Sequence, residues 1–233
     1  MEALKLERIN RIKTARFERL LLPHMPIQLH DPSSSQRDNV EQYVAGRFYA
    51  NYEAKVNSFL PYLLASSSTD NNLSAVIGFQ PANNNQPLFL EQYLENNIES
   101  ILSNRLGQDI TRNKIVETGN LTSSRPGASQ MLFILVAAIL HQAGFEWVVF
   151  TATKQVKQLL EKLDLDVVAI GDANPEYLAD KGQSWGSYYH DNPKIMTTSL
   201  TDGMRIFNQH HVIKFMLENY QNTITKLAKQ LVK

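Results

Sequence analysis

A polar turn between an apolar strand and an apolar helix carries side chains that could hold an anion. The N–H groups at the start of a helix favour negative charge, and a nearby guanidinium adds charge-assisted hydrogen bonds. The turn therefore predicts a site for a pyrophosphate-bearing cofactor, with a polar loop in solvent as the alternative. The candidate cofactor-binding residues are Asn120, Leu121, Ser124, Arg125, Gly127, Ala128 and Ser129.

Glu117 lies inside the apolar strand that leads into this turn. Because side chains alternate along a strand, Glu117 faces the side opposite to Val116 and Thr118. A carboxylate on a covered sheet is desolvated, which raises its pKa toward the range of a general base. We predict that Glu117 accepts the proton of an amine. The alternative is a glutamate on an edge strand that pairs with Arg112 or Lys114.

Two further groups of residues could contact a substrate. Glu91 and Tyr93 interrupt the otherwise apolar segment 88–94, and they either line an acceptor pocket or form the exposed side of that segment. Trp185 belongs to an aromatic group that more often forms a core or a wall. We predict that Glu91, Tyr93 and Trp185 bind substrate, and that Tyr188 or Tyr189 serves as a general acid.

Other chemistries lack their sequence patterns. The six histidines show no helical spacing with a carboxylate of the kind that zinc needs, so we expect no metal. The chain has no cysteine, which excludes disulfides and a cysteine nucleophile. Ser123 and Ser124 do not form a Gly-x-Ser-x-Gly elbow, so a serine hydrolase is not expected.

The elements that must position these residues predict an α/β (α+β) domain with a mixed sheet. Antiparallel strands come first and a strand–helix–strand crossover follows. A full dinucleotide-binding fold is not expected, because the Gly-x-Gly-x-x-Gly fingerprint is missing. We expect helices over residues 1–22, 39–54, 96–106, 126–142, 154–163 and 202–231. We expect hairpins over 60–65 with 73–80 and over 185–189 with 194–200, and strands over 114–118, 147–151 and 167–170.

The length of 233 residues suits one domain with extensions. We predict an N-terminal helical extension and loop over 1–36, a central domain over 37–200 and a C-terminal helix over 201–233. The longest apolar run, residues 131–140, is half of a membrane span, and the N-terminus has no signal-peptide pattern. These features predict a cytoplasmic protein.

The charges of the chain balance, with 23 basic and 23 acidic residues, so we expect no nucleic-acid partner. Basic residues do gather in residues 1–20 and at Lys226, Lys229 and Lys233. They form either two solvated helix faces or a weak contact with an anionic surface, which would be a membrane or an acidic carrier protein.

Two segments resemble the GNAT acyltransferases. Gly-Ala-Ser-Gln-Met-Leu-Phe at 127–133 is similar to their Gly-x-Gly-x-x-Leu-Leu core, and residues 159–165 resemble their Tyr-Glu-Lys-Leu-Gly-Phe region. The resemblance implies a splayed strand, and turn amides that hold the pyrophosphate of acyl-coenzyme A or the phosphopantetheine of a carrier protein. Three positions depart from the pattern: Ser129 replaces a glycine, Ser124 replaces Arg or Gln, and Leu160 replaces a tyrosine that often acts as general acid.

Four blocks, at residues 88–94, 115–121, 147–153 and 185–189, resemble the thermostable hemolysin family. That family has the GNAT pattern and is similar to the acyl-homoserine lactone synthases, whose Glu-x-x-Arg becomes Glu117 and Asn120 here. Within the third block, Thr151 and Thr153 are further candidates for cofactor binding.

The resemblance implies an N-acyltransferase that moves an acyl group from acyl-coenzyme A or an acyl carrier protein to a small-molecule amine. Glu117 would be its base. Two alternatives remain open at this point. One is a membrane-active hemolysin without enzymatic activity, and the other is a catalytically degenerate acyl-coenzyme A-binding module.

Overall fold

The computed structural model describes residues 25–68, 70–83 and 85–232. Within them, seven strands form one sheet: β1 (Ile27–His30), β2 (Tyr62–Ser67), β3 (Leu73–Pro81), β4 (Ile115–Ser123), β5 (Trp147–Ala152), β6 (Val168–Asp172) and β7 (Lys194–Ser199). The α-helices are α2 (Arg37–Tyr52), α3 (Ile98–Leu106), α4 (Ala128–Gln142), α5 (Lys154–Lys162), α6 (Leu200–Gln209), α7 (His211–Asn219) and α8 (Gln221–Leu231). Three 3-10 turns matter for the site: η1 (Phe89–Tyr93), η4 (Gln183–Trp185) and η5 (Tyr188–Asp191).

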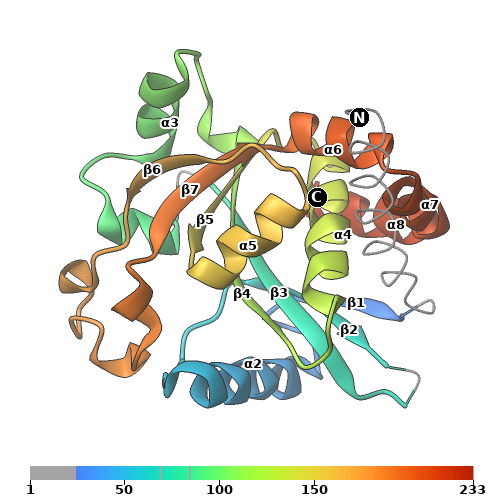
Figure 1. Ribbon diagram of the computed structural model, residues 1–233, viewed down its shortest axis with the longest axis horizontal. Helices are drawn as coiled ribbons and strands as arrows, with labels where there is room; N and C mark the ends of the chain where they lie inside the picture. The colour runs from blue at the N-terminus through green and yellow to red at the C-terminus, as the bar shows by residue number, and fades with distance from the viewer. Residues whose placement is uncertain (1–24, 69, 84, 233) are drawn as a thin grey trace, which may run out of the picture.

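The strands follow the order β1-β2-β3-β4-β5-β7-β6 across the sheet (Figure 1). Only the central pair, β4 and β5, is parallel, and α4 makes the crossover between them. The other neighbouring strands are antiparallel. This mixed sheet with flanking helices confirms the predicted fold class, including the first hairpin and the strand–helix–strand unit.

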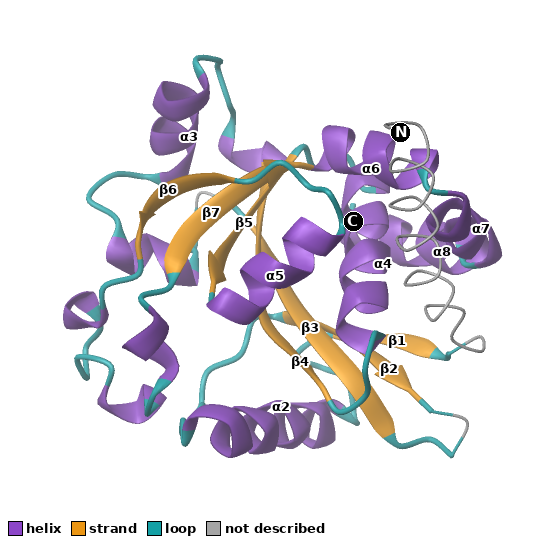
Figure 2. Cartoon of the chain, viewed as in Figure 1, coloured by secondary structure: helices purple, strands orange, loops and turns teal. Residues whose placement is uncertain are grey.

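Helices cover both faces of the sheet (Figure 2). The side chains of α2 pack on Leu63, Ala65 and Val76 of β2 and β3. The next residues along those strands, Leu64 and Ile77, point to the opposite face and pack with α4. Since α4 is apolar on all sides, it must be covered all round. The sheet covers one side of α4, and α6 and α8 cover another.

The C-terminal region forms three helices, so the prediction of a single helix over 202–231 is wrong. The chain bends at His210 and Tyr220, although residues 204–231 contain neither glycine nor proline. Intrinsic preference alone would continue the helix, but the two bends let both α6 and α8 pack on α4. The hydroxyl of Tyr220 also bonds to the backbone of Met25, 195 residues away, at 2.8 and 2.9 Å.

The N-terminal helix predicted over 1–22 lies outside the described residues. Residues 27–30, which the sequence assigned to an extension and loop, instead form β1 at the edge of the sheet. The second predicted hairpin is also wrong. Residues 183–191 form the turns η4 and η5, while β7 pairs with β5 and β6.

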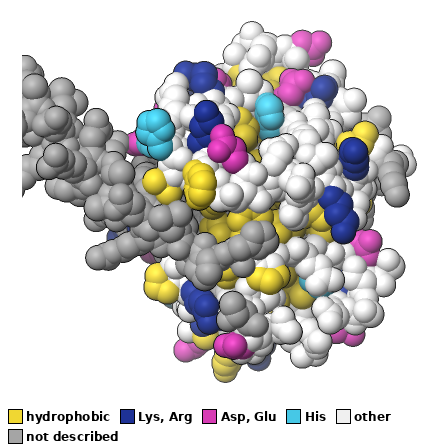
Figure 3. Space-filling view, turned by 90° about the vertical axis from the view of Figure 1, so that its right-hand side faces the viewer, with side chains coloured by type: hydrophobic (Ala, Val, Ile, Leu, Met, Phe, Trp, Pro, Cys, Tyr) yellow, Lys and Arg dark blue, Asp and Glu magenta, His cyan; other side chains and the backbone are white. Residues whose placement is uncertain are grey.

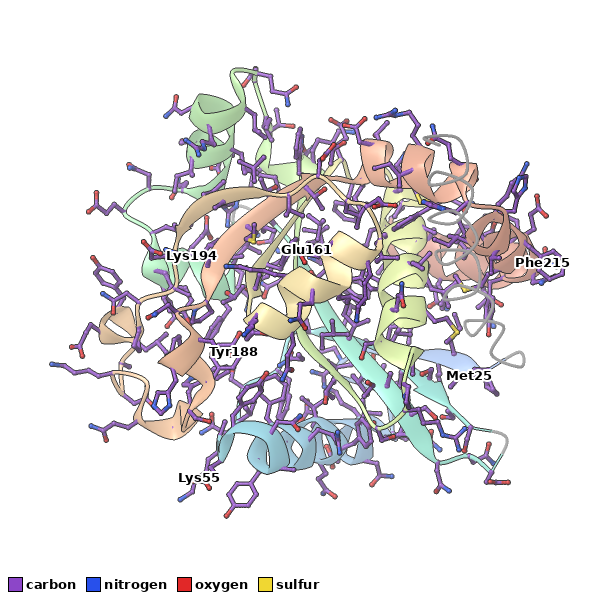
Figure 4. All side chains as sticks on the ribbon, viewed as in Figure 1. Met25, Lys55, Glu161, Tyr188, Lys194 and Phe215 are labelled. Atoms are coloured by element: carbon purple, nitrogen blue, oxygen red, sulfur yellow. The ribbon has the colours of Figure 1, made fainter. Side chains whose placement is uncertain are left out.

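Basic and acidic side chains are interspersed on the face shown in Figure 3, around a central hydrophobic area, as far as the grey atoms leave that face visible. Phe215 of α7 is 54% exposed and projects outward (Figure 4). None of the described helices combines the length and the hydropathy that crossing a bilayer requires.

Candidate active site

The parallel strands β4 and β5 separate halfway along their length. They pair from Ile115 with Trp147 up to Thr118 with Phe150, and no further. Beyond this point β4 pairs only with β3, and β5 only with β7. The centre of the sheet therefore opens into a V between residues 119–123 and Thr151 onward. The splayed strand implied by the GNAT resemblance is present.

A β-bulge marks the start of this opening. Gly78 of β3 pairs with Gly119 and Val76 pairs with Thr122, so β4 carries one more residue than β3 over this stretch. At the bulge, the backbone of Asn120 has a φ of 50°. This is a left-handed conformation that asparagine tolerates better than most residues. The predicted turn therefore begins only after Ser123, because β3 supplies hydrogen-bond partners that the local sequence does not reveal.

Asn120 also holds the loop that precedes β2. Its Oδ1 accepts a hydrogen bond from the N–H of Leu60 at 2.9 Å. The side chain reaches across Gly78, where a Cβ would lie 2.9 Å from the same oxygen. Gly78 is therefore required for this crossing. The contact places residues 58–61 over the V.

A cavity of about 480 Å³ occupies the V and the space beside it. Its walls come from both faces of the sheet. Ile77, Phe133 and Phe150 belong to the face of α4, whereas Phe48 and Glu117 lie on the face of α2. The cavity therefore passes through the sheet where β4 and β5 separate.

Glu117 lies on the wall of this cavity with only 4% of its surface exposed. It accepts N–H groups from Phe89 at 2.7 Å and from Leu90 at 3.1 Å, both in η1. Burial raises its pKa to about 8, the nearby charge of Glu91 adds to the rise, and the two N–H groups oppose it. The ion pairs among the described residues do not include Glu117. The carboxyl is thus poised to exchange a proton near neutral pH.

Arg112 was one of the two cations that could have paired with Glu117. It pairs with Glu91 instead. Arg112 binds both carboxylate oxygens of Glu91, at 2.6 and 2.8 Å, and also Glu99 at 2.8 Å. Burial raises the pKa of Glu91, but the hydrogen bonds from Arg112, Ile98 and Leu88 outweigh it and leave the pKa below its usual value. Glu91 does not line the cavity. Its carboxylate holds η1 in place.

Aromatic side chains form the wall beside Glu117. The ring centroids of Trp185 and Tyr188 lie 5.2 Å apart, and those of Tyr188 and Tyr52 lie 5.3 Å apart. Phe89 lies 6.0 Å from Trp185, so the wall continues from η4 and η5 to η1. Tyr188 lies between α2 and the start of α5 (Figure 4). Burial raises its pKa, so its hydroxyl stays protonated.

Gly186 allows this aromatic segment to dock on the end of α2. Its φ is 53°, and a Cβ there would lie 2.0 Å from the carbonyl oxygen of Tyr52. Around it, the N–H of Ser187 donates to the same oxygen at 2.8 Å, and the N–H of Lys55 donates to Ser184 at 2.6 Å. The docking places Trp185 and Tyr188 against α2, far from them in sequence.

Tyr93 and Tyr189 share a hydrogen bond of 2.6 Å between their hydroxyls. Tyr93 lines the cavity, and burial raises its pKa. Tyr189 lies behind it, and burial raises its pKa to about 12. Of the two candidate acids, Tyr188 reaches the cavity directly, and Tyr189 reaches it only through Tyr93.

The start of α4 has the features of an anion site, although it lies outside the cavity wall. The helix begins at Ala128, two residues later than predicted, after Gly127 with a φ of 80°. The first intrahelical hydrogen bond runs from Met131 to Gly127, so the amides of Ser129 and Gln130 precede it. Arg125 is exposed nearby. The hydroxyl of Ser129 donates to Ser123 at 2.6 Å and closes the turn.

The cavity brings together eight of the predicted site residues: Tyr93, Glu117, Asn120, Leu121, Thr151, Thr153, Trp185 and Tyr188. Thr153 also caps α5 through a bond from Val156 at 3.4 Å. Six other predicted residues lie outside the cavity wall: Glu91 within η1, and Ser124, Arg125, Gly127, Ala128 and Ser129 before or at the start of α4. Tyr189 is the second layer behind Tyr93.

Several residues of the wall were not among those predicted from the sequence. Phe48 and Tyr52 have i, i+4 spacing, which puts both on one face of α2 and was a usable signal. Phe133, Phe150 and Arg37 had no local signal, because a distant segment completes each contact. Among the described residues, no group of three or more histidine, aspartate or glutamate side chains could hold a metal ion.

The fold is shared with solved acyltransferase structures. The acyl-homoserine lactone synthase LasI is 13% identical, with a TM-score of 0.50 over 76% of this chain and 90% of that chain. BjaI, a coenzyme A-dependent acyl-homoserine lactone synthase solved with SAM and isopentyl-CoA, is 11% identical with a TM-score of 0.51, over 84% and 89%. FeeM, an N-acyl amino acid synthase from uncultured soil microbes, is 13% identical with a TM-score of 0.51, over 77% and 98%.

At these identities the likeness establishes the fold alone, which is GNAT-like. A comparison with curated proteins gives no match. The family model described as thermostable hemolysin matches residues 30–204, from the end of β1 into α6. Because this match spans more than half of the 233 residues, the chain belongs to the thermostable hemolysin family.

Proposed function

We propose that this protein is an N-acyltransferase that moves an acyl group from a pantetheine thioester to an amine. The observation that carries the proposal is the carboxyl of Glu117. It is buried on the wall of a cavity at the opening of the β4–β5 pair, with a raised pKa and no ion-pair partner among the described residues. A carboxylate with a pKa of about 8 suits the removal of a proton from an ammonium group.

The thioester donor fits between the start of α4 and the V. Phosphates would accept hydrogen bonds from the amides of Ser129 and Gln130, with Arg125 beside them. From Ala128 to Phe133, which lines the cavity, the helix rises about 8 Å. A pantetheine arm would cross that distance and lie between the strands, beside Asn120, Leu121, Thr151 and Thr153.

The reaction needs no covalent enzyme intermediate. Glu117 takes a proton from the ammonium, and the free nitrogen lone pair attacks the thioester carbonyl carbon. An N–H group of the splayed segment 119–121 would stabilise the developing oxyanion. The carbon–sulfur bond then breaks with its electron pair on sulfur, and the attacking nitrogen loses its second proton to water. The products are an amide and a thiol.

The departing sulfur needs a proton, and Tyr188 is the proposed donor because its hydroxyl lies at the cavity wall and stays protonated. The Tyr93–Tyr189 pair would orient the acceptor or relay a proton through its shared hydrogen bond. Leu160 cannot supply one, since it is a fully buried aliphatic residue.

Release of free thiol tests the proposal. The purified chain is mixed with an amine panel and with either acyl-coenzyme A or an acyl carrier protein as donor. We expect amine-dependent thiol release with at least one donor, and its loss in Glu117→Gln. Tight thioester binding without release would favour the degenerate binding module. Leakage of dye from vesicles, without any thioester present, would favour the membrane-active alternative.

A further inference from the structure

We propose that the acceptor is a primary amine on an aromatic or aliphatic body that carries no carboxylate. The inference rests on the proposed function, and it concerns the part of the cavity on the α2 face. We name this part the aromatic compartment, and it is lined by Phe48, Tyr52, Phe89, Tyr93, Trp185 and Tyr188.

The aromatic compartment and the donor side of the cavity lie on opposite faces of the sheet. Tyr52, Tyr188 and Phe48 pack with the α2 cluster, and Phe89 and Trp185 pack with the η1 cluster on the same face. Ile77, Phe133 and Phe150 belong to the α4 face, where the turn before α4 also lies. A thioester that enters from the α4 face would thus meet an acceptor that is held among aromatic rings.

The rings form a continuous surface around Glu117. Tyr188 is central to it, with centroids of Phe48, Tyr52 and Trp185 within 6.3 Å. Such a surface attracts an ammonium group through the ring quadrupoles, and it also accepts an aromatic or aliphatic body by apolar burial. Once it is deprotonated, the carboxylate of Glu117 adds a negative charge where the ammonium must lie.

The charge of the wall argues against an acidic acceptor. Among the described residues that line the cavity, only Glu117 and Arg37 are charged. Arg37 is already engaged, because its Nε donates to Glu41 at 2.6 Å and its other nitrogens donate to three backbone carbonyls: those of His30, Leu60 and Pro61. These bonds use four of the five N–H groups of the guanidinium.

An amino acid acceptor would therefore place its carboxylate in this cavity beside Glu117, and the described lining residues offer no free cation to pair with it. An ionised carboxylate buried without a partner is strongly disfavoured. The same amine without the carboxylate has no such cost. The aromatic compartment should therefore favour an amine over the amino acid that differs from it only by a carboxylate.

Matched pairs of acceptors test this inference: tyramine against tyrosine, and phenethylamine against phenylalanine. Thiol release measures transfer, and calorimetry without a donor measures acceptor binding. We expect each amine to exceed its amino acid by about a hundredfold or more in kcat/KM, as for a site in which a buried group is left unpaired. We also expect each amine to bind with a Kd of about 1 mM or below.

The two measurements separate this inference from the proposed function. Amine binding without thiol release would support the compartment and count against acyl transfer. Equal or better transfer to the amino acids would support acyl transfer and overturn the inference. Absence of amine binding would overturn it as well.

Variants of the wall complete the test. Tyr188→Leu should raise the amine Kd by about tenfold and leave the thioester Kd unchanged, whereas Tyr188→Phe should retain amine affinity because it keeps the ring. If Tyr188→Leu does not fold, the amine Kd of Tyr52→Leu tests the same wall. Tyr49→Leu is the matched control, because Tyr49 lies on α2 with 59% of its surface exposed and is not part of the wall. An unchanged amine Kd in both Leu variants of the wall would contradict the proposal.

Discussion

The carboxylates of Glu117 and Glu91 bind the same short turn of backbone. Glu91 accepts the N–H of Leu88 at 2.7 Å, and Glu117 accepts the next two N–H groups, at 2.7 and 3.1 Å. Within the part of the chain that the structure describes, Glu91 pairs with a cation, Arg112, and Glu117 does not. The two acids therefore differ in environment, and their pKa values move in opposite directions. Such divergence in a pair of titratable groups is typical of acid–base sites.

Glu117→Gln should lower kcat for amide formation by about 10²–10⁴-fold, the usual contribution of a general base, with little change in thioester affinity. In the unsubstituted protein, kcat/KM should rise with pH through an apparent pKa of about 8, because the base must be deprotonated. Stopped-flow thiol assays across pH check both points. Glu95→Gln, at an exposed glutamate in the loop after η1, is the control. A pH-independent rate would exclude Glu117 as the base.

The raised pKa of Glu117 also makes stability depend on pH. The folded carboxyl holds its proton up to about pH 8, whereas the unfolded one loses it near its ordinary value of 4.5. Between these values the folded state binds more protons, so the free energy of unfolding falls as pH rises, by up to about 1.4 kcal/mol per pH unit. Urea titrations at several pH values should show a shallower fall in Glu117→Gln. If the free energy of unfolding fell equally with pH in both proteins, the raised pKa of Glu117 would be refuted.

The position of Glu117 could be predicted from the sequence because it depends on local alternation along one strand. The same holds for the first hairpin and for the β4–α4–β5 unit, whose apolar patterns are strong. The extension of β4 to Ser123 could not be predicted, since polar residues there find their partners on β3. The breaks at His210 and Tyr220 come from packing around α4, which outweighs helix preference.

The wall of the cavity was the least predictable part. Trp185 and Tyr188 were recognised as aromatic, but a strand was predicted for them. Their actual place depends on Gly186, whose positive φ bends the chain onto the carbonyl of Tyr52. No spacing rule connects Ser187 with Tyr52, 135 positions away, so a wall made by such docking cannot be derived from periodicity.

Arg112→Met should weaken both stability and catalysis. It leaves Glu91 and Glu99 without their cation, and the loss of one partner of a largely buried ion pair costs about 3 kcal/mol. The unpaired charge of Glu91 should push the pKa of Glu117 higher and move the pH–rate curve to more alkaline pH. Glu91→Gln in the same chain should move the curve back. Arg105→Met, at an exposed position on α3, is the control, and an unmoved curve in Arg112→Met would contradict the coupling.

Gly186→Ala should displace the segment 183–191 from α2, because the new Cβ would lie 2.0 Å from a backbone oxygen that cannot move independently. We expect a large fall in melting temperature, altered fluorescence of Trp185 and weaker amine binding. Gly46→Ala on α2 is the matched control, because nothing lies within 4 Å of its Cβ and helix preference should add up to about 1 kcal/mol. If the two variants had similar melting temperatures, fluorescence and amine affinity, the docking of segment 183–191 would not depend on Gly186.

Asn120→Gly isolates what the side chain of Asn120 contributes to the bulge. Glycine keeps the backbone at a φ of 50° without strain, so only the bond from Leu60 N–H to Oδ1 is lost, at about 1 kcal/mol. Since this bond holds residues 58–61 over the V, we expect a higher KM for the thioester, measured by initial rates. Asn120→Asp retains the acceptor and should behave nearly as the unsubstituted protein does. Asn71→Gly removes an asparagine with a φ of 60° from an exposed turn and should leave KM unchanged. If Asn120→Gly also leaves KM unchanged, the loop does not depend on this bond for its place over the donor site.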